Sequence, residues 1–198
     1  MLTSADILSI SEFERVRSIK RKEILQLKEN RRLAVGPDIT FYFENVQTIW
    51  WQIQEMLRIE NGGEEQVADE LGAYNPLIPV RQEKGYELSA TMMIEIDDSV
   101  RRKVVLNQLF GIDQHIMFEL QNATIPAASI DPSEERNRAE DHKTLAVHFL
   151  KWLVPTNLVG SFLSEDVHLT INHPYYSFKS LLSQSLKESL KKDLEIMS

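Results

Sequence analysis

Hydrophobic residues recur at helical spacing in three long stretches of the chain, so we expect an amphipathic helix in each. The first covers residues 11–29, and Ser11 with Glu14 has the spacing of a capping box at its start. The second covers 46–60. The third covers about 175–196 and carries, along one face, an apolar row made of Phe178, Leu182, Leu186, Leu190 and Leu194.

Other stretches alternate between apolar and polar residues, which is typical of a strand with one buried face. The clearest is 86–96, whose even positions are apolar and whose odd positions are mostly polar. Two further helices are expected at 64–75 and 97–111, and an exposed polar loop at 131–142. The remaining expected strands cover 33–35, 39–43, 115–121, 124–130, 143–153 and 166–172.

Strands that follow one another through short turns favour antiparallel pairing. We therefore expect a single α+β domain over residues 1–198, with an antiparallel sheet of about five to seven strands. Long N-terminal, central and C-terminal helices should pack on this sheet. Pro126 lies inside strand 124–130 and indicates that this strand is irregular or lies at an edge.

The charge of the chain excludes some partners. The formal net charge is −8, which argues against nonspecific binding to nucleic acid or to an anionic membrane. Eight basic residues crowd positions 15–32 against Glu23 and Glu29, whereas eight acidic residues in 38–70 face Arg58 alone. We expect these two segments to attract each other, within one subunit or between subunits. A basic anion-binding groove is the sharper alternative.

Missing residue types and motifs exclude further classes. The chain has no cysteine, so it has no disulfide, thiolate metal site or cysteine-ligated iron–sulfur cluster. The N-terminal stretch MLTSADILSISEFERV lacks the apolar run of a signal peptide, and no window approaches a membrane span. We expect a cytoplasmic protein with no membrane partner. Without a Walker loop, a GxGxxG or a GxSxG motif, no nucleotide cofactor and no nucleophile elbow are expected.

Several motifs occur together in a recognisable order along nearly the whole chain. They read VGPDITFYFENVQTIWWQIQEMLRIE, DELGAYNPLIP, GYELSATMMIEI, LAVHFL and INHPYY. In this combination the sequence resembles the bacterial family known as domain of unknown function 3501, which has no established activity. Members of that family look like companions of rubrerythrin and iron–sulfur oxidoreductase genes. The resemblance therefore implies a role in oxidative stress, iron or redox handling, by association and not by mechanism.

The second helix contains two adjacent tryptophans, which cannot both face one core. Trp50 falls on the continuous apolar stripe of the helix and is expected in the core. Trp51 falls on the opposite side with Glu55 and Arg58. We expect Trp51 to pack against another helix or a second subunit. The alternatives are that it walls a ligand pocket or anchors a partner, as Trp and Arg often do in interfaces, or that it is merely exposed.

Five histidines are present without HExxH or another compact ligand spacing. Strand alternation gives His115, His148 and His168 each a defined face, so two or three imidazoles could converge across a sheet, with Glu95 or Glu119 nearby. Such a group would suit iron, manganese or zinc. The alternative is that these are scattered histidines, hydrogen-bonded to the backbone.

One further histidine precedes a proline. His173 and Pro174 are expected to open the last helix, because proline suits the first helical position and histidine can cap it. Tyr175 and Tyr176 follow and could wall a small ligand.

These residues lead to one hypothesis with two alternatives. We expect a homodimeric accessory protein that binds a metal or small ligand in oxidative-stress, iron or redox handling. The ligand site is placed at Trp51, Glu55 and Arg58, and a metal (Fe, Mn or Zn) at Glu55 with His148 and His173 as secondary ligands. One alternative is a protein-interaction module that docks a partner oxidoreductase and has no small-molecule site. The other is a metal-dependent enzyme.

Overall fold

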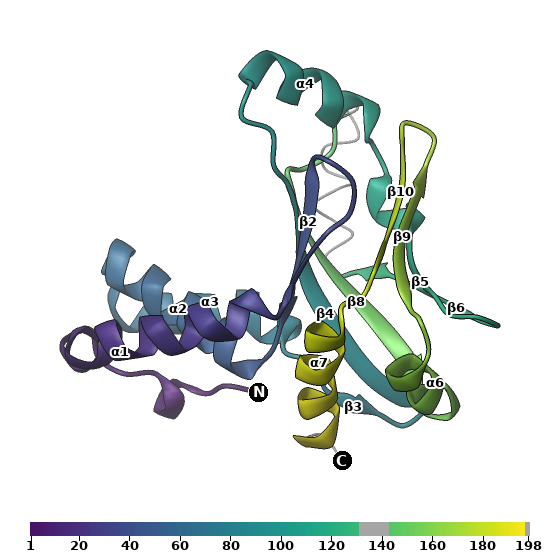
Figure 1. Cartoon of the computed structure of the whole chain (residues 1–198). Coiled ribbons are helices and arrows are strands. Elements are labelled where there is room, and N and C mark those ends of the chain that lie inside the picture. Colours follow the sequence, from purple (N-terminus) through teal and green to yellow (C-terminus); the bar gives the residue numbers. More distant parts are fainter. Residues whose placement is uncertain (131–142, 197–198) are drawn as a thin grey trace.

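The computed structural model describes residues 1–130 and 143–196. It has two antiparallel sheets, and a lobe of helices projects from one side of the molecule (Figure 1). The predicted α+β class is confirmed, although the strands divide between two sheets instead of forming one. The loop expected at 131–142 lies outside the described residues. Among the described helices, none combines the length and apolar character that crossing a membrane requires.

The larger sheet is built around β4, Gly85–Ile94, which pairs with β2 on one side and β8 on the other. The even positions of β4 are buried from Leu88 onward, as predicted. Ser89 and Thr91 on the opposite face are buried as well, so β4 is covered on both sides. The strand order is β1-β2-β4-β8-β7, and β3 also pairs with β4. The bounds are β1 Arg32–Ala34, β2 Ile39–Glu44, β3 Arg81–Gln82, β7 Ala128–Ser129 and β8 Val147–Pro155.

The smaller sheet has the order β10-β9-β5-β6. The stretch expected as one strand at 124–130 is broken after Pro126, so that its first part pairs in this sheet and its second part pairs with β8 in the larger one. Proline cannot donate to a strand ladder, which explains the break. The bounds are β5 Ile116–Glu119, β6 Thr124–Pro126, β9 His168–His173 and β10 Tyr176–Leu181.

The expected helix at 175–196 is wrong in its first part. Residues 176–181 form β10, which pairs with β9 in register over six residues, and the helix α7 covers only Gln184–Ile196. A spacing of four fits both the helical period and the strand period of two, so Phe178 matched the apolar row in either structure. His173 and Pro174 consequently lie at the end of β9 and in a tight turn, and they do not open a helix.

The main core fills the space between the two sheets. Trp152 of β8 is almost fully buried at its centre, with its ring centroid 4.8 Å from that of Phe118 in β5 and 6.1 Å from that of Phe43 in β2. The helix α7 adds three leucines of the predicted apolar row, Leu186, Leu190 and Leu194, and Leu182, which precedes the helix, is buried in the same core. Both sheets and the last helix therefore share one hydrophobic core, which their members bury from water.

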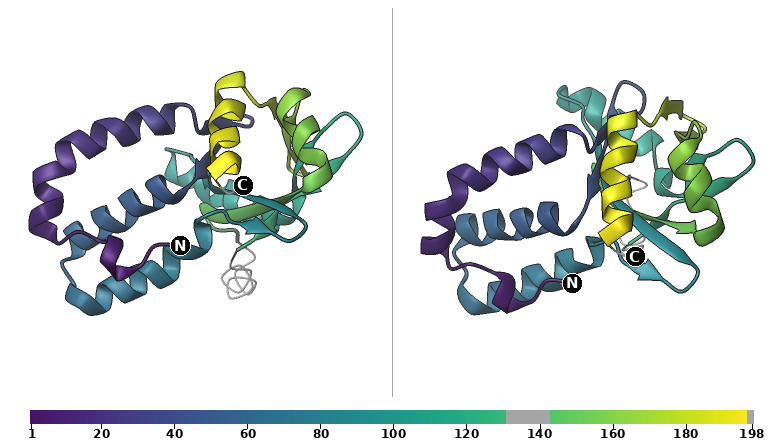
Figure 2. Two further views of the ribbon diagram at one scale, coloured as in Figure 1. Left: turned by 90° about the horizontal axis from the view of Figure 1, so that it is seen from below. Right: turned by 60° about the horizontal axis from the view of Figure 1, so that its bottom comes forward.

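The helical lobe packs on the other face of the larger sheet through a second core. Figure 2 shows α2 between α1 and α3 in one layer. Ile49, Ile53 and Leu57 of α2 meet Leu77 and Ile78 beside the sheet. This contact is the reason why the second face of β4 is buried. Besides α7, the helices of the described residues are α1 Ile10–Glu29, α2 Val46–Glu60, α3 Gly63–Tyr74, α4 Ser99–Gln108 and α6 Val159–Ser164, and short 3-10 turns include η1 Ser4–Asp6, η2 Asn75–Leu77 and η3 Ile112–His115.

The first helix begins two residues earlier than its expected capping box. Ser9 is the cap, and it exchanges hydrogen bonds with Glu12, whereas Ser11 and Glu14 lie inside the helix. Both pairs have the same spacing, so the sequence alone could not distinguish them.

A buried arginine ties the lobe to the body of the molecule. Arg31, between α1 and β1, is 1% exposed and forms an ion pair of 2.7 Å with Asp193 of α7. Its Nε and Nη2 donate to the carbonyl oxygens of Phe43 and Glu44, and its Nη1 donates to Ser189 Oγ. The guanidinium therefore fixes α7 against the junction of the lobe with the larger sheet.

Candidate functional site

The two tryptophans hold one phenylalanine of α1 between them. The Phe13 ring centroid lies 5.9 Å from that of Trp50 and 5.4 Å from that of Trp51, both in edge-to-face geometry. Trp51 thus packs against the N-terminal helix within the same chain, which was one of its expected environments. The prediction for Trp50 is wrong, because α2 turns Ile49 and Ile53 toward the core and leaves Trp50 half-buried at its flank.

Both carboxylate oxygens of Glu55 accept hydrogen bonds from arginine side chains. Arg17 Nε donates to Oε1 at 2.7 Å, and Arg58 Nη2 donates to Oε2 at 3.0 Å. Burial raises the pKa of the Glu55 carboxyl, but the hydrogen bonds and charges of the two guanidinium groups outweigh it and hold the pKa below its usual value. Arg58 also lies 3.7 Å from Glu14 of α1. The expected attraction between the basic and acidic segments is confirmed at this α1–α2 seam, within one chain.

The two histidines predicted as metal ligands, His148 and His173, have protein partners. His148 is buried in β8, and its Nε2 lies 2.9 Å from Thr144 Oγ1 and 3.0 Å from the Leu145 oxygen. His173 Nε2 donates to the Phe110 oxygen at 3.2 Å, so its Nδ1 accepts the Tyr175 N–H at 3.3 Å. Burial lowers the pKa of His173, against the effect of the Phe110 hydrogen bond.

Two of the histidines, His115 and His173, lie close together, a pairing that the sequence did not suggest. The ring centroids of His115 and His173 lie 5.0 Å apart, and His115 lowers the pKa of His173 further. His168 lies opposite Glu119 in the same sheet, while His148 belongs to the other sheet. Across residues 1–130 and 143–196, no group of three or more His, Asp or Glu side chains is placed to hold a metal ion.

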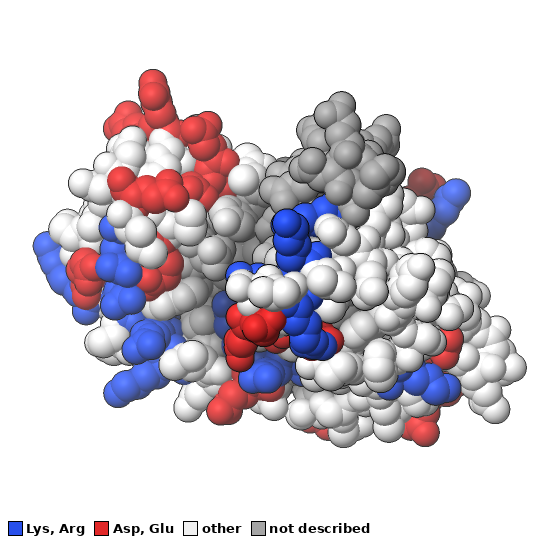
Figure 3. Space-filling view, turned by 90° about the horizontal axis from the view of Figure 1, so that it is seen from above, with Lys and Arg blue, Asp and Glu red and all other residues white. Residues whose placement is uncertain are grey.

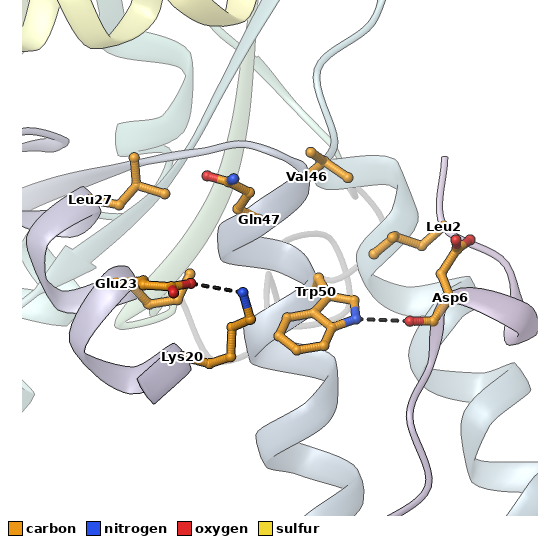
Figure 4. Close-up of a pocket in the computed structure, with 9 residues that line it drawn as sticks. Leu2, Asp6, Lys20, Glu23, Leu27, Val46, Gln47 and Trp50 are labelled. Carbon is orange, nitrogen blue, oxygen red and sulfur yellow. Dashed lines mark hydrogen bonds and ion pairs between the residues drawn. The ribbon is translucent and has the colours of Figure 1, made fainter. Parts of the chain in front are cut away.

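A groove opens on the other side of the α1–α2 seam, next to Trp50. Its volume is about 360 Å³, and Figure 4 shows residues of α1, α2 and the N-terminal segment around it. Its lining is mostly apolar at the walls, with two acids, one lysine and one amide among the other groups. The lining residues are Leu2, Asp6, Lys20, Glu23, Ile24, Leu27, Val46, Gln47 and Trp50.

Hydrogen bonds fix the walls of this groove. Trp50 Nε1 donates to the backbone carbonyl oxygen of Asp6 at 2.9 Å, which orients the indole (Figure 4). Leu2 is held by Asn75, whose side chain accepts from the Leu2 N–H and donates to the Leu2 oxygen, both at 2.9 Å. Lys20 Nζ pairs with Glu23 at 2.8 Å on the α1 side. The groove is therefore formed before any ligand arrives, as most small-molecule sites are.

Sequence reasoning missed this groove for an identifiable reason. Lys20 and Leu27 are one heptad apart on α1, and that spacing could have marked a shared face. Leu2 and Asp6, however, come from the N-terminal segment around η1, whose path over α2 no local pattern predicts. The groove exists only because this segment folds back over α2.

Comparison with other proteins identifies the family. A family model described as "Protein of unknown function (DUF3501)" matches residues 1–194. A crystal structure of a "novel protein of unknown function" from Burkholderia pseudomallei K96243 superimposes with a TM-score of 0.86 at 29% identity, over 97% of this chain and 98% of that one. No curated protein matches the chain. The resemblance in the motifs is thus confirmed, and the chain belongs to the DUF3501 family.

Proposed function

We propose that this chain is a small-molecule-binding accessory protein, and that the α1–α2 groove beside Trp50 is its ligand site. The observation that carries the proposal is the preformed apolar groove of about 360 Å³, a size within the range of about 300–1,000 Å³ that is usual for ligand pockets. Trp50 offers an aromatic face and Leu27 an aliphatic one. A compact molecule with an aromatic or aliphatic body would bury its apolar surface there.

The polar groups of the groove narrow the ligand class. The Lys20 ammonium is the only basic group among the lining residues, and its one ion-pair partner there is Glu23. A ligand carboxylate or carbonyl could share this donor, and α2 adds the Gln47 amide to the lining (Figure 4). We therefore infer a ligand with an apolar body and an acidic or carbonyl end.

The sites expected from the sequence are less suited to bind a ligand or a metal. Glu55 already receives hydrogen bonds on both carboxylate oxygens, and His148 and His173 each contact protein oxygen atoms. A ligand or metal at these residues would have to replace those contacts, which costs the hydrogen bonds that buried polar groups require. The redox or iron setting of the proposed function rests on the family resemblance.

A ligand screen with a groove-filling variant tests the proposal. Saturation-transfer NMR would be run with a set of aromatic and aliphatic carboxylic acids, amides and amines. In Leu27→Trp the larger side chain occupies the groove, so binding should be lost. Leu25→Trp is the matched control, because Leu25 lies on the same helix, is 54% exposed and is not part of the groove lining.

Binding by wild type and Leu25→Trp with loss in Leu27→Trp is the expected result. Equal binding by all three proteins would overturn the assignment of the site. Failure of every acid, amide and amine to bind the wild type would overturn the proposed ligand class. Circular dichroism of both variants would show that they fold.

A further inference from the structure

The groove beside Trp50 changes from charged to apolar along its length. The helix α1 runs toward the larger sheet and α2 runs away from it, because the paired strands β1 and β2 join them. Lys20 of α1 therefore lies at the end of the groove away from the sheet, and Leu27 lies at the end next to it. Figure 4 shows the other walls in the same order, with Trp50 and Asp6 toward the charged end and Val46 and Leu2 toward the apolar end.

A second hollow adjoins the apolar end of the groove. Its volume is about 260 Å³, and Val46 lines both the groove and this hollow. Met1, which precedes Leu2 of the groove lining, forms part of its wall. The rest of its apolar surface comes from the segment after η2, namely Ile78, Pro79 and Val80. Apolar surface therefore extends beyond the groove, on the far side of Val46.

The polar residues around the second hollow have partners within the chain. Asn45 Nδ2 donates to Asp193 Oδ1 at 3.1 Å, and Asp193 Oδ2 pairs with Arg31 at 2.7 Å. The Arg81 guanidinium lies over the Tyr86 ring, 5.5 Å from its centroid. Because replacing such contacts is costly, the second hollow offers a ligand mainly its apolar surface.

We propose that the ligand of the groove is a long unbranched carboxylate, with its charged end at Lys20 and its tail running past Val46 into the second hollow. This inference rests on the function proposed above and names its ligand class. The groove extends from Lys20 to Leu27, which is seven residues or about 10 Å of helix. Extended octanoate has about this length, so a longer tail has to enter the second hollow.

The charge around Lys20 suits an anionic end. Figure 3 shows the acidic side chains of the lobe gathered on one side and the basic ones on the other. Lys20 belongs to α1, which also exposes Arg15, Arg21 and Lys22, and such a cluster attracts an anion. The Glu23 side chain that pairs with Lys20 is 55% exposed. An exposed ion pair contributes little stability, so a ligand carboxylate can replace Glu23 at Lys20.

A chain-length series tests this proposal. Hexanoate, octanoate, decanoate and dodecanoate would be titrated calorimetrically into the wild type and into variants. Val80→Trp fills the second hollow and leaves the groove lining unchanged. Val100→Trp is the matched control, because Val100 is 72% exposed on α4 and lines neither site. Lys20→Gln removes the charge that holds the carboxylate.

In the wild type and in Val100→Trp, affinity should rise by up to about fourfold for each added methylene, and this rise should continue beyond octanoate. In Val80→Trp octanoate should bind as in the wild type, and dodecanoate should bind no tighter than octanoate. Lys20→Gln should weaken all four acids by the same factor. Val80→Gln, a smaller change that makes the hollow more polar, should shift the series in the same direction if Val80→Trp does not fold by circular dichroism.

The outcomes separate this inference from the proposed function. If octanoate binds the wild type but longer acids bind no tighter, the function stands and the second hollow takes no part. Unchanged binding of dodecanoate in the Val80 variants, or of all acids in Lys20→Gln, would also overturn the inference. Loss of octanoate in Val80→Trp would contradict the order of the two sites along the ligand. If no acid of any length binds the wild type, both the inference and the proposed ligand class fail.

Discussion

Replacing Arg31 by alanine would leave a buried carboxylate without its counter-charge. The Arg31 side chain is 1% exposed and that of Asp193 10%, and within the described residues Asp193 Oδ2 has no partner other than this guanidinium. The substitution also removes the donors to the carbonyl oxygens of Phe43 and Glu44. It therefore affects the only described ion pair that joins α7 to the α1–β1 junction.

The magnitude follows from the burial of both charges. Removing one partner of a buried ion pair costs about 3–5 kcal/mol. For a domain of this size, 1 kcal/mol corresponds to roughly 2–4 °C, so Arg31→Ala should lower Tm by about 6–20 °C. Urea unfolding followed by circular dichroism would give the change in the free energy of unfolding, and thermal scans would give Tm.

Two comparisons separate the buried charge from other effects. Arg32→Ala removes the exposed neighbour and should change the free energy of unfolding by less than about 0.5 kcal/mol. Arg31→Met combined with Asp193→Leu removes both charges and should be more stable than Arg31→Ala alone, since no uncompensated charge remains. A loss below about 1 kcal/mol in Arg31→Ala, or a double variant less stable than the single one, would refute this reasoning.

Two further perturbations test the Gly36 turn between β1 and β2, which contacts Tyr176 of the smaller sheet, and His173 at the end of β9. Gly36 has φ +74°, and a Cβ there would lie 2.5 Å from the Tyr176 hydroxyl. Gly36→Ala should therefore lower the free energy of unfolding by more than the roughly 1–2 kcal/mol that left-handed strain alone costs. Gly63→Ala is the control in urea unfolding, because Gly63 has φ +79° and no neighbour within 4 Å, so this variant should show the strain alone. Equal costs at both glycines would contradict the clash. Because the pKa of His173 is lowered from 6.5 on folding, the unfolded chain binds more protons in that range, so stability should be full above about pH 6.5 and fall as the pH drops below it. Urea midpoints between about pH 5 and 8 should flatten in His173→Gln relative to wild type, and an unchanged slope would contradict this role.

Local patterns predicted the elements well where one period dominates. The alternation in β4 and the stripe of α2 each correspond to an observed element within two residues. The leucine row of α7 is also buried as expected. Each of these signals is set by residues close together in the chain, which is what periodicity measures.

The failures share a different cause. Phe178 fitted both periods, and only the pairing of β10 with β9 decided between them. Trp50 belongs to the stripe of α2 but lies at its flank, because the direction of the core depends on where the sheet sits. The contact of His115 with His173 joins residues from two elements far apart in sequence. Such outcomes depend on tertiary packing, which overrides local preference.

The candidate site, too, could be predicted from the sequence only in part. The sequence grouped Trp51, Glu55 and Arg58 on one face of α2, and the structure keeps them together. The sequence could not show that Arg17 and Phe13 of α1 occupy that face, or that the open groove lies on the other side of the contact between α1 and α2. The position of α1 across α2 decides which face a ligand can reach.

The indole N–H signals of the three tryptophans test the central claim most directly. In a ¹⁵N-labelled sample, single Trp→Phe variants would assign the signals of Trp50, Trp51 and Trp152, and a carboxylic acid that binds in the screen would then be titrated. A ligand in the groove should shift the Trp50 signal in a saturable way and leave that of Trp152 in place, because Trp152 is buried between the sheets. A saturable titration in which the Trp50 signal stays still would contradict the account.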